Sequence, residues 1–112
     1  MNNVEIWVNK QRDGYNFVIL PSIQGLIKKL VPDARPANSI YVEDEVRREC
    51  QKDILDLESS IYPVLLGIHD KNALKHIGKI DFIDPQTRNV LNSIQLCPEN
   101  LINSSEWRGI WQ

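Results

Sequence analysis

Acidic side chains are the most concentrated charged groups in this chain. Between residues 43 and 58 there are seven acidic and three basic residues, so this segment carries a net charge of −4 in a chain whose total is −2. Such a surface would attract a basic partner and select against acidic competitors. The alternative is an ordinary solvated helix face, whose charges partly offset one another. The partner-binding residues predicted on this segment are Glu43, Asp44, Glu45, Glu49, Asp53 and Asp56.

No metal site is predicted at these carboxylates, because they lack the ordered spacing and the glycine of a calcium-binding loop. Nucleotide and nucleophile motifs are also missing: the sequence has no glycine-rich phosphate loop, no Gly-x-Ser-x-Gly and no Cys-x-x-Cys. We therefore predict no cofactor.

The two histidines are the one group from which an acid–base enzyme could be assembled. His69 and His76 lie seven residues apart, and together they could act as general base and general acid in phosphodiester cleavage. Three nearby lysines could stabilise the charge that develops on the phosphate: Lys71, Lys75 and Lys79. Because most loop histidines are simply solvated, a small RNA-cleaving enzyme is kept as an alternative, and no catalytic residue is predicted.

Two tryptophans and two cysteines complete the candidates. Trp107 and Trp111 lie four residues apart, where they either cap the core or, with Arg108 between them, anchor a partner. Both are included in the predicted partner-binding surface. Cys50 and Cys97 have no metal-ligand spacing and are predicted to be free thiols, with a single disulfide between them as the alternative.

Two β-hairpins are expected to provide the framework for these side chains. The first covers about residues 4–20, where apolar and polar residues alternate and Asp13-Gly14 marks the turn, a dipeptide that tolerates positive φ. The second covers about residues 77–97 and turns at 84–87, whose Asp-Pro start suits a type I turn.

Two main helices are expected between the hairpins. Residues 22–30 place apolar side chains on one stripe, with Ser22 as the N-cap. Residues 43–59 have the apolar spacing of a helix and acids at its start. The short segment Ile40–Val42 fits either a strand or the first helical turn. The apolar run Val64–Ile68 has the length of a buried strand, although a buried helical turn fits it as well.

These elements predict one globular domain over residues 1–112, of the α+β class, with a mostly antiparallel sheet from the two hairpins and the two helices packed on one face. The apolar content of 42% and charged content of 25% are those of a soluble protein. No apolar run has the length of a membrane helix, and the N-terminus does not resemble a secretion signal, so a cytoplasmic location is expected.

The functional class expected from these observations is a small, non-catalytic binding protein that inhibits a basic protein partner. Its most concrete form is an immunity protein or antitoxin that neutralises a toxin, for example a nuclease. Nucleic acid is not expected as a partner, because no basic cluster is set among aromatic residues. A further alternative is a subunit or adaptor of a bacterial or phage assembly, with an exposed apolar patch at the tryptophans or at a free hairpin edge.

Overall fold

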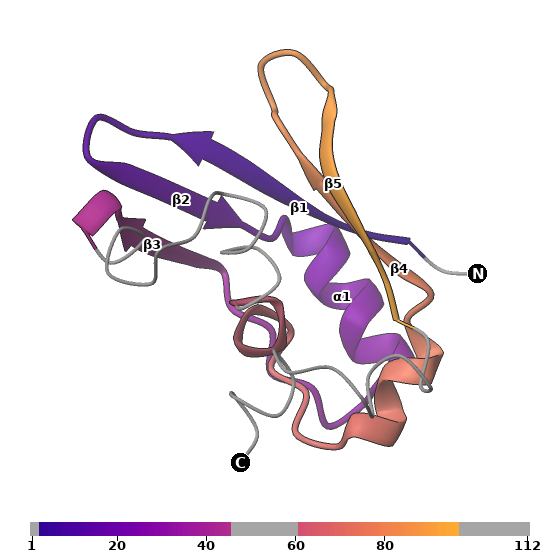
Figure 1. Ribbon diagram of the computed structural model, residues 1–112. Coiled ribbons are helices and arrows are strands. Elements are labelled where there is room, and N and C mark those ends of the chain that lie inside the picture. Colours follow the sequence, from indigo (N-terminus) through magenta and orange to yellow (C-terminus); the bar gives the residue numbers. More distant parts are fainter. Residues whose placement is uncertain (1–2, 46–60, 97–112) are drawn as a thin grey trace.

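The described residues form five strands, which pair into one mixed sheet (Figure 1). The computed structural model describes residues 3–45 and 61–96. Its strands are β1 (Asn3–Lys10), β2 (Gly14–Val18), β3 (Ser39–Glu43), β4 (Lys79–Ile83) and β5 (Val90–Gln95). Their order is β3-β2-β1-β4-β5, and every neighbouring pair is antiparallel except β1 and β4, which are parallel. The predicted α+β class and both hairpins are confirmed, and the segment that the sequence left open, Ile40–Val42, belongs to a strand.

One face of this sheet is buried because apolar residues occupy alternate positions along its central strands. Val4, Ile6 and Val8 of β1 are all buried on this face. Phe17 of β2 and Phe82 of β4 meet edge to face across β1, with ring centroids 6.3 Å apart, a favoured geometry for aromatic pairs. The core is therefore centred on β1.

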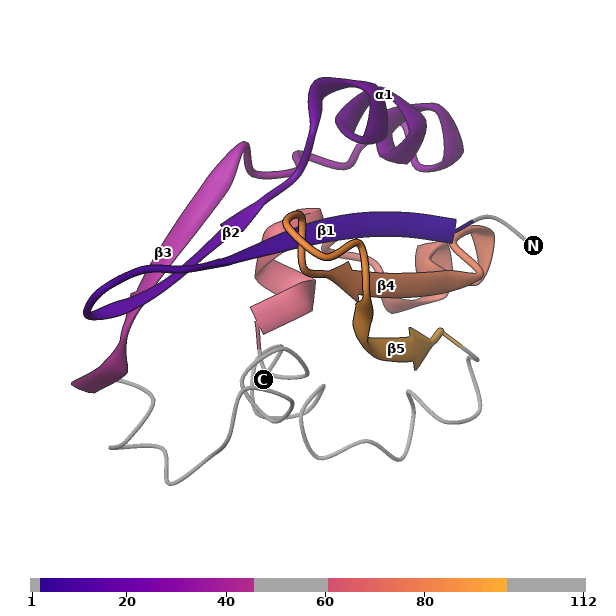
Figure 2. The same cartoon turned by 90° about the horizontal axis from the view of Figure 1, so that it is seen from above.

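Helix α1 (Pro21–Leu30) contributes Ile27 to this core and lies along one side of β1 (Figure 2). The predicted range of the helix is confirmed, but Ser22 is not its N-cap. Leu20 occupies that position without a side-chain capping bond, and Pro21 is the first helical residue. The fixed φ of proline suits the first turn of a helix, where its missing N–H costs nothing.

Of the two structures that fitted the apolar run Val64–Ile68, a buried strand and a buried helical turn, the helix is observed: residues 61–66 are helical, and the run leaves the helix at Gly67. Leu65 and Leu66 are both buried whereas Val64 is 56% exposed, a pattern that alternation along a strand does not produce. Gly67 ends the helix in the left-handed conformation, with φ of 61°. Its carbonyl accepts a hydrogen bond from the Arg35 N–H at 2.9 Å, which joins this segment to the loop after α1.

Only the start of the predicted 43–59 helix falls within the described residues. Glu43 ends β3, residues 44–45 are helical, and the remainder of that prediction lies outside the described part of the chain. A short 3-10 helix, η1 (Lys71–His76), begins after Asp70, whose carboxylate accepts a hydrogen bond from the Asn72 N–H at 3.0 Å. Among the described residues, no helix has the length and apolar content needed to cross a membrane.

The β4–β5 hairpin contains an irregular register between Phe82 and Ile83. Phe82 pairs with Asn92 but Ile83 pairs with Val90, and Val90 is 55% exposed. The β1–β4 pairing ends at Ile83, and beyond that point the two hairpins diverge (Figure 1).

Candidate functional site

The turn between β1 and β2 meets the end of β3. Gly14 pairs with Glu43 across the β2–β3 ladder, and the Asp44 N–H donates to the Asp13 carbonyl at 2.8 Å. This pairing gathers residues from two distant segments around a hollow of about 340 Å³, which we name the acidic end surface: Arg12, Asp13, Glu43, Asp44 and Glu45. Four carboxylates and one guanidinium share this end of the sheet.

Gly14 permits the close approach of β3. A Cβ atom at this position would lie 2.7 Å from the Tyr41 hydroxyl oxygen and closer still to the Val42 carbonyl oxygen. Positive φ, the reason for glycine that the sequence suggested, does not apply, because Gly67 is the glycine with positive φ among the described residues. Glycine is therefore required by contact rather than by backbone conformation.

Tyr41 lies beside the acidic end surface, and its hydroxyl donates a hydrogen bond to the Asp13 carboxylate. The side chain is 45% exposed. This hydrogen bond, then desolvation, and then the negative charges of Asp13, Glu43 and Asp44 raise the pKa of Tyr41 to about 12. The result is an exposed aromatic ring beside carboxylates, hydrogen-bonded to one of them.

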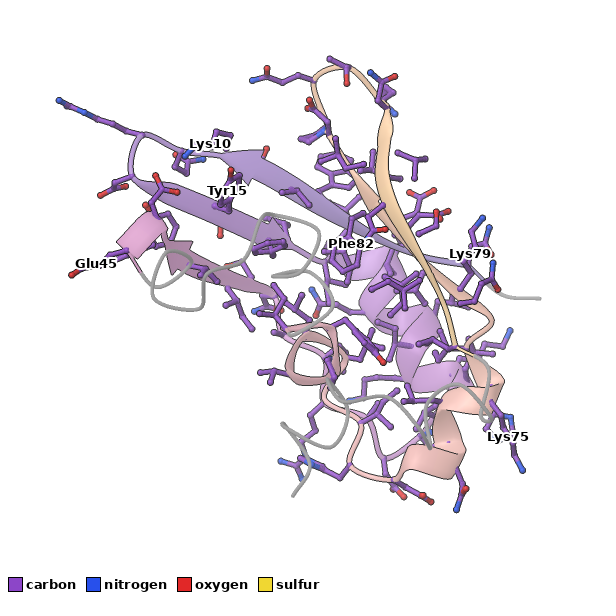
Figure 3. The ribbon with its side chains drawn as sticks, in the orientation of Figure 1. Lys10, Tyr15, Glu45, Lys75, Lys79 and Phe82 are labelled. Carbon is purple, nitrogen blue, oxygen red and sulfur yellow. The ribbon has the colours of Figure 1, made fainter. Side chains whose placement is uncertain are left out.

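Lys10 offsets part of the negative charge. Its Nζ lies 3.2 Å from Asp44 Oδ2 and 4.5 Å from the centre of the Tyr15 ring. Lys10 and Tyr15 are labelled on the first hairpin in Figure 3. Ion pairs as exposed as this one contribute little to stability. The Lys10–Asp44 pair instead holds the Asp44 carboxylate beside Lys10, while Glu43 and Glu45 remain exposed to solvent.

Three of the predicted partner-binding residues are thus brought together: Glu43, Asp44 and Glu45. The other five predicted residues lie outside the described part of the chain: Glu49, Asp53, Asp56, Trp107 and Trp111. Both cysteines, Cys50 and Cys97, lie outside it as well. Sequence reasoning missed Asp13 and Tyr41, which join the site only through the β2–β3 register. Recognition of residues 40–42 as a strand paired with β2 would have found them.

The histidines lie at the two ends of η1. His69 directly precedes the Asp70 N-cap, and His76 is the last residue of this helix. Both side chains are exposed. Lys79 forms an ion pair with Asp81 at 3.5 Å. Figure 3 places Lys75 and Lys79 at the opposite end of the molecule from Glu45.

Within residues 3–45 and 61–96, no three histidine, cysteine or acidic side chains are arranged to hold a metal ion. Comparison with protein-family models, with curated proteins and with solved structures finds no match for this chain. The functional argument therefore depends on the geometry of the acidic end surface.

Proposed function

We propose that this protein acts in the cytoplasm as a non-catalytic inhibitor that binds a basic protein partner through the acidic end surface, in the manner of an immunity protein or antitoxin. The observation that carries the proposal is the convergence of Asp13 with Glu43, Asp44 and Glu45 at one end of the sheet, with Tyr41 hydrogen-bonded to Asp13 beside them.

The surface combines two properties that protein recognition uses. Clustered carboxylates accelerate encounter with a basic partner and disfavour acidic competitors. Tyrosine is enriched among the residues that dominate binding energy. The backbone that carries Asp13, Glu43 and Asp44 is held by the β2–β3 pairing, so these residues are already neighbours in the free protein.

The test is capture of the partner from the source cells, followed by kinetics with matched variants. The double variant Glu43→Lys/Glu45→Lys should slow association about tenfold or more, because it reverses two exposed charges at the site. Raised salt should weaken wild-type binding in the same way. Glu5→Lys is the control, since Glu5 is exposed in the middle of β1, away from the site.

The captured basic protein should also inhibit growth when it is expressed alone, and co-expression with the wild-type chain should restore growth. An equal effect of Glu5→Lys and of the double reversal would contradict recognition at the acidic end surface. A partner that is harmless when expressed alone would contradict the inhibitor function.

A further inference from the structure

A second concave site lies between the two hairpins. The last paired residues of β1 and β4 are Trp7 and Ile83, and β1 continues to Lys10 while the chain after Ile83 enters the β4–β5 turn. The hairpins diverge here (Figure 1) and leave a notch of about 230 Å³. Its lining includes Val8, Lys10, Tyr15, Asp84, Gln86 and Leu91.

Most residues that line this notch are polar, but Val8, Tyr15 and Leu91 form an apolar part of its wall, and Asp84 adds a carboxylate. Val8 is buried, Tyr15 is half-buried, and Leu91, on the opposite hairpin, is 42% exposed. Asp84 accepts a hydrogen bond from the Gln86 N–H at 2.9 Å through Oδ1. Its carboxylate takes part in neither of the ion pairs found in the described part of the chain, which are Lys10–Asp44 and Lys79–Asp81.

Lys10, the cation that lines the notch, is directed elsewhere. Its ammonium group lies above the Tyr15 ring and pairs with Asp44, on the side of β3. Figure 3 shows Lys10 beside Tyr15 on the first hairpin. The charge of Asp84 therefore remains available to a cation that enters from outside.

The size of the notch restricts its occupant. Sites for small molecules and cofactors commonly measure about 300–1,000 Å³, and this notch is smaller. The volume of the notch suits a single side chain better than a whole ligand. Among side chains, arginine combines an aliphatic stem, which suits Val8 and Leu91, with a planar cation that binds carboxylates well.

We propose that the notch binds one arginine side chain of a partner protein, with its stem against Val8 and Leu91 and its guanidinium at Asp84. The proposal deepens the proposed function and rests on it for the source of this side chain, the basic partner. Recognition would then involve both the acidic end surface and the notch, with Lys10 lining the notch and paired with Asp44 of the surface.

Two blocked tripeptides test the notch without the partner: Gly-Arg-Gly, and Gly-citrulline-Gly, in which the side chain keeps its shape but loses its charge. Titration into the isotope-labelled protein should shift the backbone amide NMR signals of Asn9, Gln86 and Leu91. We expect the arginine peptide to bind about fivefold more tightly than the citrulline peptide. This difference in affinity corresponds to the largest free energy that one exposed ion pair usually contributes.

Asp84→Asn should abolish this preference, because it removes the charge and keeps an oxygen that can accept the Gln86 hydrogen bond. Asp81→Asn is the matched control and should preserve the preference, since Asp81 pairs with Lys79 and does not line the notch. Leu91→Ala should weaken binding of both peptides.

The proposal is overturned if the two peptides bind equally, if Asp84→Asn leaves the preference intact, or if shifts occur only at Asp13 and Glu43–Glu45. Any of these results leaves the proposed function standing, because no partner is used. Conversely, if the charge-reversal experiment contradicts the proposed function, the peptide titration still tests the notch, because it uses neither the partner nor those variants.

Discussion

Tyr41 and Asp13 form a pair whose coupling can be measured directly. The ordinary pKa of tyrosine is 10.0, and the hydrogen bond to Asp13 is the largest cause of its increase to about 12. Asp13→Asn should return the pKa of Tyr41 toward 10, because the acceptor loses its charge. NMR titration of ring-labelled tyrosine reports this value, with Tyr41→Phe to assign the signal. Asp33→Asn, in the exposed loop after α1, should leave it unchanged.

The same shift predicts how stability depends on pH. The folded state holds the Tyr41 proton more tightly than the unfolded state, so this contribution to stability is fully present below pH 10. It is lost as the pH rises from 10 toward about 12. Tyr41→Phe should remove this part of the decline when urea unfolding is measured over that range. An identical decline in the wild-type protein and Tyr41→Phe would show that the pKa is not raised.

Two glycines should respond oppositely to the same substitution. Gly14→Ala places a Cβ against the Val42 carbonyl and the Tyr41 hydroxyl, and should destabilise the protein by about 1–3 kcal/mol. Gly25→Ala lies in the middle of α1 with nothing within 4 Å of the new atom, and should stabilise it by about 0.5–1 kcal/mol. Urea unfolding measures both. If both substitutions changed the free energy of unfolding equally, the close contact of β3 with Gly14 would be contradicted.

Elements were predictable from the sequence where the pattern was local. The alternation in β1 and the Asp-Pro turn predict the two hairpins within their own residues, and the apolar stripe of 22–30 predicts α1. Val64–Ile68 was left open between strand and helix because an apolar run lacks a period, and the left-handed backbone of Gly67 and its bond to Arg35 show where the helix ends.

The candidate site was predictable only in part, because the sequence pattern shows local groupings but not which distant segments meet. Glu43, Asp44 and Glu45 are adjacent in the sequence, so their grouping was visible. Asp13 and Tyr41 are 28 residues apart and meet through the pairing of β2 with β3. A hydrophobic pattern identifies which face of a strand is buried, but it does not identify the strand's neighbour.

The helical assignment of residues 61–66 has a direct test. Leu65→Ala should destabilise the protein by about 2–5 kcal/mol, because Leu65 is fully buried in the core. Val64→Ala, the adjacent and similar truncation, should change the free energy of unfolding by less than about 0.5 kcal/mol, because Val64 is 56% exposed. A large loss at Val64 with little change at Leu65 would require the opposite face of this segment to be buried.

At the scale of the whole molecule, the charged groups of residues 3–45 and 61–96 are distributed unevenly along the sheet. Asp13 and Glu43–Glu45, partly offset by Lys10 and Arg12, gather at the end formed by the first hairpin and β3, whereas Lys75 and Lys79 lie at the opposite end (Figure 3). A basic partner that approaches such a molecule is oriented as well as attracted. The notch lies beside the same acidic end, so an oriented partner would meet both candidate contacts together.

The parallel pairing of β1 with β4 also has a consequence for synthesis. Each residue of β1 from Asn3 to Trp7 pairs with the residue 76 positions later, so the central strand lacks one neighbour until β4 leaves the ribosome. At ordinary rates of translation this interval lasts roughly 4–15 s. During it, a strand rich in valine and isoleucine keeps an open edge, a state that favours pairing between chains. Nascent chains on the same messenger RNA are therefore most exposed to mutual aggregation before β4 is made.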